Sequence, residues 1–115
     1  MMAFARFLIL ACLIVQIPPE QVLRVIDGDT FIVMDFDVPP ETRIRVLGVD
    51  TPERGQPGYA EAGAFTREWL ARGPFTVTTC ERDSLLRRLG KIERGSEGLH
   101  TALIESGHGV VRTGR

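Results

Sequence analysis

Hydrophobic and polar residues alternate in short stretches along most of the chain after residue 20, and turn-forming residues separate these stretches. Side chains of a β-strand point alternately to its two faces, so a period of two indicates half-buried strands. The alternation predicts five strands, at 22–26, 31–34, 43–49, 75–80 and 88–93. Two segments with helical spacing, 59–72 and 97–106, follow the third and the fifth strand. The chain is therefore expected to be mainly β with helices, an α+β protein.

The order of these segments narrows the fold class further. Five short strands with one helix inserted after the third are typical of a small closed or nearly closed barrel, as in the OB-fold, which is one candidate among several. With 115 residues the chain has room for one small domain. We expect a five-stranded OB-fold barrel with about two helices, preceded by a short apolar N-terminal segment.

The N-terminal segment has a different pattern. Residues 7–15 form an uninterrupted apolar run after Arg6. Such a run has the length of a signal-peptide core and is shorter than the roughly 20 residues of a transmembrane helix. We expect residues 1–17 to be a signal peptide or membrane anchor, with membrane contact through 7–17, and residues 18–115 to form the domain. The protein would then be secreted or membrane-anchored, and otherwise cytoplasmic; the alternative is that the run is an extra strand or packed helix of the domain.

The two cysteines are Cys12, in the apolar run, and Cys80, at the end of a predicted strand. They set no disulfide framework. If the N-terminal segment is removed, Cys80 is left without a partner and is expected to be a partly buried small hydrophobic residue.

The formal net charge is −1, which argues mildly against a protein that is coated in nucleic acid through bulk electrostatics. Lys91 is the only lysine among 14 basic residues, and the rest are arginines. A guanidinium presents a planar fork of donors that matches phosphate oxygens in pairs, so this composition favours local phosphate recognition. A GC-rich genome would give the same composition without that function.

Three charged segments stand out because a simple scaffold does not need them. In the first, Asp27 and Asp29 flank Gly28 at a strand end, where carboxylates can hold a hard cation. The same sequence is also a common hairpin turn. The third segment, 83–88, is by itself a polar turn that we expect to lie on the solvated surface.

The second segment begins with Arg45 on the polar face of a predicted strand that ends in Asp50, with Glu53 three residues later. Pro52 disfavours a helical backbone at the residue before it, so the two carboxylates are expected to leave the strand in a rigid turn. The alternative is the N-terminal capping box of a helix. Residues 54–58 are a poor helix start, which weakens that alternative.

Together these segments resemble the staphylococcal nuclease (thermonuclease) family over residues 19–111. The matching stretches are 26–30 and 45–53 for the two signatures, 60–66 for the first helix, and 102–107 for the second helix. Their joint occurrence is specific, whereas any one of them alone is not.

The resemblance implies an OB-fold endonuclease that hydrolyses phosphodiester bonds in DNA or RNA with Ca²⁺ as cofactor. Asp29 and Asp50 would bind Ca²⁺ through their carboxylates, and Thr51 through its backbone carbonyl. We expect nucleic acid as the substrate and a monomeric protein.

The resemblance also implies three catalytic residues. Glu53 would act as the general base or orient the attacking water. Arg45 and Arg87 would contact the phosphate and stabilise the charge that builds up on it. These roles are chemically consistent, because a cation and two guanidinium groups neutralise negative charge at phosphorus while a carboxylate accepts the proton of water.

The third segment departs from the family, which has an acidic residue followed by Tyr-Gly-Arg or Phe-Gly-Arg, where residues 83–87 read Asp-Ser-Leu-Leu-Arg. Alignment on Asp83 and Leu89 puts Arg87 in the catalytic position, and a rival alignment on Leu89 and its neighbouring glycine puts Lys91 there. We prefer Arg87 because that register continues without gaps to the second predicted helix.

Two consequences follow from this departure. Leu85 cannot stack on a base as an aromatic ring does, and Leu86 does not have the access of glycine to positive φ. The chain also ends at Arg115, without the closing C-terminal helix of the family. The competing hypothesis is therefore an OB-type module that binds nucleic acid or a protein without cutting, and a truncated chain that does not fold stably is a third.

Overall fold

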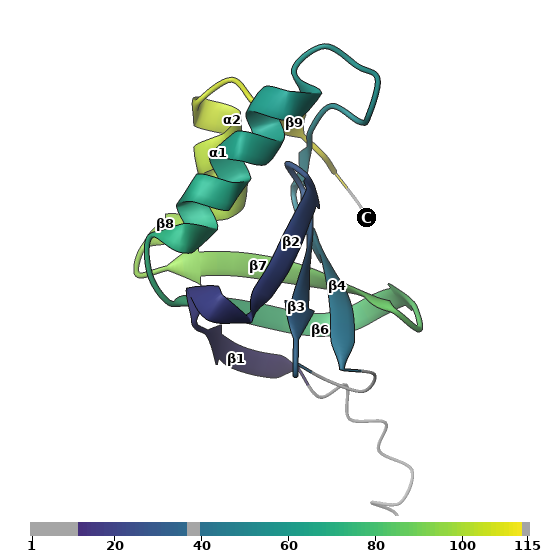
Figure 1. Ribbon diagram of the computed structural model, residues 1–115, viewed down its shortest axis with the longest axis vertical. Helices are drawn as coiled ribbons and strands as arrows, with labels where there is room; N and C mark the ends of the chain where they lie inside the picture. Colours follow the sequence, from purple (N-terminus) through teal and green to yellow (C-terminus); the bar gives the residue numbers. More distant parts are fainter. Residues whose placement is uncertain (1–11, 37–39, 114–115) are drawn as a thin grey trace, which may run out of the picture.

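The computed structural model describes residues 12–36 and 40–113, which form a curled β-sheet with two helices packed against one end (Figure 1). In chain order the elements are β1 (Leu13–Ile17), the short 3-10 helix η2 (Pro19–Gln21), β2 (Val22–Asp27), β3 (Thr30–Met34), β4 (Glu41–Val46), β5 (Val49–Asp50), α1 (Tyr59–Ala71), β6 (Phe75–Ser84), β7 (Arg87–Arg94), β8 (Glu97–Gly98), α2 (Leu99–Glu105) and β9 (Val110–Val111).

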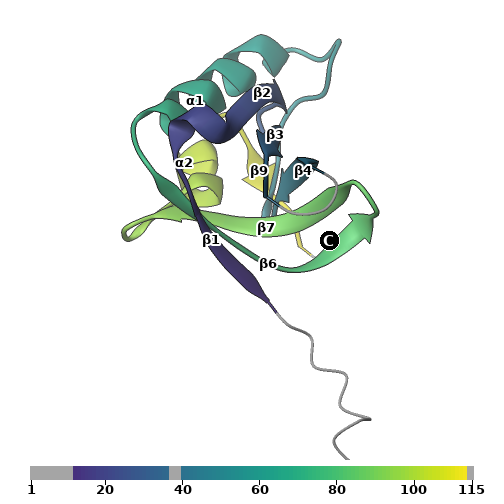
Figure 2. The same cartoon turned by 60° about the horizontal axis from the view of Figure 1, so that its bottom comes forward.

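The main sheet has the strand order β1-β6-β7-β4-β3-β2, with β8 added on β7, while β5 and β9 form a separate two-stranded sheet. β4 and β7 pair in parallel, and the other neighbours pair antiparallel. β1 and β2 are the two ends of the order and do not pair with each other, so the sheet is curled but not closed. Figure 2 shows β1, β6 and β7 as a lower layer, with β2, β3 and β4 rising from it toward the helices.

The α+β class predicted from the pattern is confirmed, and all five predicted strands and both predicted helices are present. The open, curled sheet is compatible with an OB-like fold. The predicted third strand, 43–49, is wrong at its end: β4 stops at Val46, and Gly48 at φ +88° turns the chain into β5. The sequence pattern predicts that the second helix begins at residue 97, but α2 begins at Leu99, because residues 97–98 pair with β7 as β8.

The hydrophobic core lies between the sheet and the inner side of α1. Trp69 and Phe75 are at most 1% exposed, and Phe31 packs edge-on against Phe75 with ring centroids 6.0 Å apart. Ala62, Phe65 and Trp69 stand three and four residues apart in the sequence, a spacing that puts them on one face of α1. Ala62 and Trp69 are indeed fully buried, whereas Phe65 is partly buried against the ring of a histidine after α2.

Part of the segment that we assigned to a signal peptide or anchor belongs to the sheet in this structure. Residues 13–17 form β1, which pairs antiparallel with β6, and Ile17 is fully buried. This is the extra strand that the sequence left open as the alternative; residues 1–11 lie outside the described residues. Neither helix in the described part of the chain has the length and apolar character needed to span a bilayer.

The prediction that the two cysteines form no disulfide framework is wrong for the chain with its N-terminal segment present. Cys12 and Cys80 form a disulfide that ties the start of β1 to β6, and Cys80 is exposed rather than partly buried. The pairing follows from the register, in which Leu13 faces Thr79 and so brings the preceding and following residues together. No spacing rule could have revealed it, since 68 residues separate the two cysteines.

Candidate active site

The turn between β2 and β3 holds a buried carboxylate. Asp29 is only 5% exposed, and its two oxygens accept hydrogen bonds on both sides. Oδ1 accepts from the hydroxyl of Thr30 at 2.9 Å, and Oδ2 accepts from the backbone N–H of Thr51 at 2.9 Å and from its hydroxyl at 3.2 Å. The hairpin-turn reading of this segment is therefore confirmed, since Asp27 pairs with Thr30, and the turn also presents a fixed carboxylate.

Arg45 joins this carboxylate to the second segment. It lies on β4 and is 6% exposed. Its guanidinium donates to the carbonyl oxygens of Val46 and Val49, at 2.6 and 2.9 Å. It also forms ion pairs with Asp29 Oδ1 at 3.6 Å and Asp50 Oδ1 at 2.5 Å. Four predicted site residues thus form one connected cluster, in which Arg45 contacts Asp29 and Asp50 while Thr51 contacts Asp29.

Gly28 is required because the turn approaches α1 and the second segment very closely. A Cβ atom at this position would lie 2.8 Å from the Thr51 side chain and 2.9 Å from the Ala62 Cβ. α1 also holds the turn through hydrogen bonds, from the Thr66 hydroxyl to the Gly28 carbonyl at 2.6 Å and from the Tyr59 hydroxyl to the Ile26 carbonyl at 2.7 Å. The helix therefore positions the carboxylate turn as well as filling the core.

Asp50 has a second cationic partner that the sequence did not reveal. Arg112 donates to Asp50 Oδ1 at 3.1 Å, because β9 pairs with β5 and returns the C-terminal segment to the site. A Cβ atom on Gly109 would lie 2.5 Å from a Val49 methyl group, so this close pairing needs glycine there. The pairing involves only two residues on each strand, too few for a sequence signal.

Glu53 follows in an exposed loop rather than in a helix. Its backbone N–H donates to the side-chain oxygen of Gln56 at 2.8 Å, and α1 begins only at Tyr59 after Gly58. The capping-box alternative is therefore wrong. A hollow of about 330 Å³ lies beside this loop and is lined by Asp50, Thr51, Pro52, Gln56 and residues 107–110.

Arg87 lies on the neighbouring strand, but its guanidinium faces a different acid. β4 and β7 place Arg87 opposite Arg43, two residues before the Arg45–Leu89 pair. Its side chain is 37% exposed and forms an ion pair with Asp83 at 2.6 Å across the β6–β7 turn. Thus the fold brings Arg87 to the same side of the sheet as Arg45, without contact to Asp29 or Asp50.

Lys91, the rival candidate for this position, lies beyond the part of β7 that pairs with β4. It faces Thr78 on β6, and its ammonium group lies 3.4 Å from Glu93. The β6–β7 turn itself is solvated, as the sequence predicted. Leu85 and Leu86 at its tip are 72% and 51% exposed.

Asp27, the other carboxylate that flanks Gly28, is a titratable neighbour of the site. Its pKa is raised to about 6, first because burial disfavours the charged carboxylate, and then because of hydrogen bonding with and repulsion from Asp29. The Asp29 backbone N–H donates to Asp27 Oδ1 at 3.1 Å and, together with Arg45, partly opposes this shift. Of the two carboxylates that flank Gly28, only Asp29 has an ion pair with Arg45 and hydrogen bonds to both of its oxygens.

Asp27→Asn is expected to stabilise the protein at about pH 8. The folded-state pKa of about 6 lies above the unfolded value of 3.8, so the contribution of the Asp27 carboxyl to stability is fully present below about pH 4 and is lost as the pH rises through 6. Removing the charge while keeping the acceptor should raise the free energy of unfolding by ~1–3 kcal/mol at about pH 8 and by little at about pH 4. Urea denaturation in EDTA at the two pH values measures this difference, and an equal effect at both would contradict the assignment.

The site offers the oxygen ligands that a hard cation prefers, but too few of them to complete its coordination. Ca²⁺ takes about six to eight oxygen ligands. Both oxygens of Asp29 already accept hydrogen bonds, whereas Asp50 Oδ2 has no partner among the described residues and the Asp50 side chain is 47% exposed. Within the same residues, no group of three or more His, Cys, Asp or Glu side chains is arranged to hold a metal ion. Backbone, water or substrate oxygens would have to supply most of the ligands.

Comparison with known proteins gives a partial match. No family model matches the chain. Two Escherichia coli proteins, one of them from O157:H7, are each 36% identical to it over 72 residues, and both are named "Uncharacterized endonuclease". The match covers 63% of the chain and 46% of each relative, so the chain spans about half the length of the curated relatives it matches.

Proposed function

We propose that the chain is an endonuclease domain that hydrolyses phosphodiester bonds in DNA or RNA. The observation that carries this proposal is the contact of Arg45 with both Asp29 and Asp50, which brings the first and second charged segments together around one polar centre. The names of the two E. coli relatives support a nuclease, and the two signature stretches of the sequence favour the thermonuclease type.

In the proposed mechanism, the chain's own charges act on the phosphate and the water. Arg45 is held rigidly by two carbonyls and two carboxylates, so its remaining exposed surface can stabilise charge on a phosphate oxygen without reorganisation. Arg87 would join it after leaving Asp83, an exchange between two exposed partners that costs little. Glu53, exposed at the rim, would accept the proton of the attacking water.

Ca²⁺ is the proposed cofactor, held by Asp50 together with Asp29 and the Thr51 carbonyl. When bound it would supply positive charge next to the phosphate and lower the pKa of a bound water. Asp50 is the residue best placed to bind it, because its side chain is half exposed and one oxygen is free among the described residues.

The disulfide supports a proposal about location. Disulfides persist in oxidising compartments and are rare in the cytosol. The Cys12–Cys80 bond therefore favours a protein that acts outside the cytoplasm, either secreted or anchored at a membrane.

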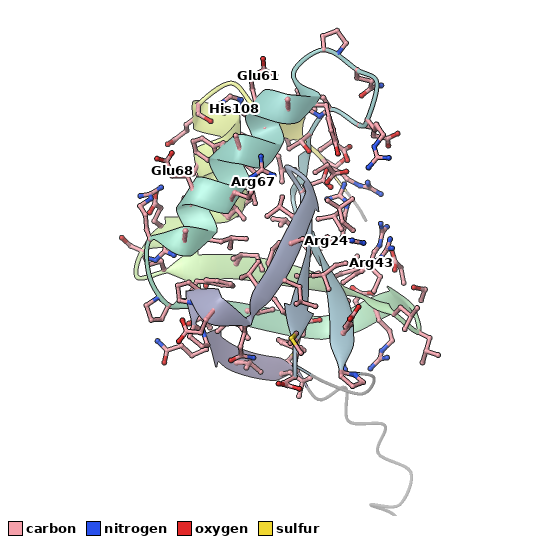
Figure 3. All side chains as sticks on the ribbon, viewed as in Figure 1. Arg24, Arg43, Glu61, Arg67, Glu68 and His108 are labelled. Atoms are coloured by element: carbon pink, nitrogen blue, oxygen red, sulfur yellow. A yellow bond between two sulfur atoms is a disulfide. The ribbon has the colours of Figure 1, made fainter. Side chains whose placement is uncertain are left out.

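Glu53→Gln is expected to lower the rate of cleavage by ~10²–10³-fold, because the neutral amide cannot accept the proton of the attacking water. The assay follows cleavage of a labelled single-stranded oligonucleotide with Ca²⁺ and with chelator. Glu68→Gln is the matched control: it changes the same charge on the exposed side of α1, and its activity should equal that of the parent (Figure 3).

The alternative is a module that binds without cutting. Two observations favour this alternative: the guanidinium of Arg87 is already in an ion pair with Asp83, and the leucines at the tip of the β6–β7 turn are exposed. Oligonucleotide binding with no cleavage product from the parent protein, whether or not Ca²⁺ is present, would establish this alternative and refute the nuclease proposal. Cleavage by Glu53→Gln as fast as by the parent would refute the assigned role of Glu53.

A further inference from the structure

Two arginines outside the proposed active site stand in one row with Arg87. In the register of the main sheet, Arg87 on β7 faces Arg43 on β4, Arg43 faces Ile32 on β3, and Ile32 faces Arg24 on β2. Residues that face each other across paired strands project from the same side of a sheet. The three guanidinium groups therefore lie on one surface of the sheet, on either side of a buried isoleucine.

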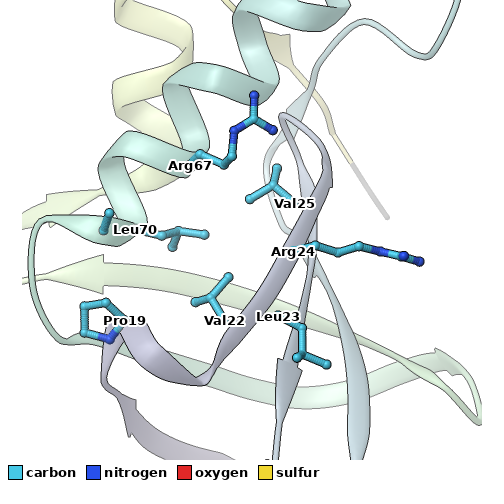
Figure 4. Close-up of a pocket in the computed structure, with 8 residues that line it drawn as sticks. Pro19, Val22, Leu23, Arg24, Val25, Arg67 and Leu70 are labelled. Atoms are coloured by element: carbon cyan, nitrogen blue, oxygen red, sulfur yellow. The ribbon is translucent and has the colours of Figure 1, made fainter.

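The surface between these arginines is continuous and hollowed. One hollow of about 460 Å³ is lined by Arg24, Ile32, Arg43 and Leu86, with Pro40 and Glu41 at its edge. A second, of about 410 Å³, shares Arg43 and Leu86 and continues to Arg87. Figure 3 shows Arg24 and Arg43 extending on the same side of the sheet, and in Figure 4 Arg24 points away from the apolar hollow between β2 and α1.

Arg24 and Arg43 differ from the other arginines near the site in having no acidic partner. Both are exposed, and neither guanidinium forms an ion pair or a hydrogen bond within the described residues. Arg45, Arg87 and Arg112 are all paired with aspartates. Two carboxylates face the row, Glu41 at the edge of the first hollow and Asp83 in the second, and Asp83 is already paired with Arg87. The unneutralised charge therefore lies at Arg24 and Arg43.

We propose that Arg24 and Arg43 bind backbone phosphates of the nucleic-acid strand at some distance from the bond that is cut. This inference rests on the proposed function, because it takes Arg87 as a ligand of the reacting phosphate. Strands in a sheet are ~4.8 Å apart, so Arg24 stands about 14 Å from Arg87 along the row. At a rise of ~3.4 Å per nucleotide in a stacked strand, the row covers about four nucleotides.

The chemistry of the row fits a phosphodiester backbone. Arginine forks match phosphate oxygens in pairs, and a regular row of them suits a regular line of charges. Ile32 and Leu86, which line the surface between the arginines, are apolar and provide no donor or acceptor for reading a base edge, and the one hydroxyl among the described residues of the lining is that of Ser84 in the second hollow. The row should accordingly bind strands of any sequence and set how long a strand the protein prefers.

The test measures binding by fluorescence anisotropy in EDTA, so that the readout does not depend on cleavage. The probe is a labelled single strand of roughly 20 nucleotides, titrated between about 50 and 200 mM salt. For the Arg24→Gln/Arg43→Gln double variant, the slope of log affinity against log salt should become shallower by about 1.4, since each phosphate contact contributes ~0.7 for a single strand. Affinity at about 50 mM salt should fall on the order of 10-fold or more.

Two matched variants make the test specific. Arg72→Gln removes the same charge at the far end of α1 and should leave the slope unchanged, while Glu41→Gln should strengthen binding because it removes a negative charge beside the row. Thermal melts check that each variant is folded. In a cleavage assay, the double variant should show a raised KM for the long strand and an unchanged rate on a dinucleotide.

The outcomes separate this inference from the nuclease proposal. A double variant that binds with the salt slope of the parent overturns the inference, whatever the cleavage assay shows. A parent that binds through the row but yields no product leaves the inference standing and overturns the nuclease proposal. A parent that does not bind the strand at all overturns the inference directly.

Discussion

Replacing Arg45 by methionine is expected to destabilise the protein by about 3–5 kcal/mol, the cost typical of removing one partner from a buried ion pair. Arg45 is 6% exposed and is the cation that faces Asp29, itself 5% exposed. The substitution also leaves the carbonyl oxygens of Val46 and Val49 without their donor. Urea denaturation of the parent and the variant measures the loss. Under the proposed function, cleavage should fall by ~10²–10³-fold as well.

Arg87→Met is the control that separates a structural role from a catalytic one. Its ion pair with Asp83 is exposed, and such pairs contribute about 0–1 kcal/mol, so the stability of this variant should stay close to that of the parent. Cleavage should nevertheless fall as it does for Arg45→Met. A double-mutant cycle with Asp29→Asn tests the pairing, because the coupling should be large for Arg45 and close to zero for Arg87. Equal stability of Arg45→Met and the parent would contradict the structural role.

Reducing the Cys12–Cys80 disulfide is expected to cost about 4 kcal/mol, because the bond closes a loop of 68 residues and restricts the unfolded chain. That loss is a large part of the roughly 5–15 kcal/mol that stabilises a typical domain. The midpoint of urea denaturation should therefore move to a much lower concentration when reductant is added. Cleavage by the folded fraction should not change, since the bond joins β1 to β6, which lie at the opposite end of the molecule from the turn between β2 and β3 (Figure 1).

The Cys12→Ser/Cys80→Ser double variant is the control for the disulfide. It should match the reduced parent in stability and should not respond to reductant. If the parent unfolds at the same urea concentration with and without reductant, the bond contributes no stability and the loop-closure argument is wrong. Single serine variants are less suitable, because the remaining free thiol can form bonds between molecules.

The parts of the fold that depend on local pattern could be predicted from the sequence. The alternation around Arg45 correctly predicted a strand there and the residues on its two faces, although not its end, and the helical spacing of 59–72 located α1 to within a residue or two. β1 was harder to predict because a uniformly apolar run has no period of two to show that it is a strand. Its partner, β6, is about 60 residues further along the chain.

The candidate site, too, has parts that local sequence patterns predict and parts that depend on distant pairings. Asp29, Arg45, Asp50 and Thr51 are brought together as the sequence signatures suggested. Arg112 could not be predicted, because it reaches Asp50 only through the two-residue pairing of β5 with β9. The roles assigned to Glu53, Arg87 and Ca²⁺ stay predictions, and the position of the Arg87 guanidinium against Asp83 depends on a turn conformation that no short motif specifies.

The hydrogen bonds from Tyr59 and Thr66 to the β2–β3 turn give α1 a mechanical connection to the carboxylates, and Gly28 lets the surfaces touch with almost no clearance. Elements joined in this way open and close together in native-state fluctuations. A ligand that stabilises the turn, such as a bound phosphate, should therefore slow the local opening of α1 as well, although the ligand itself does not contact the helix. The helix in turn holds the backbone of the turn in place, so the Asp29 side chain keeps its position without a ligand.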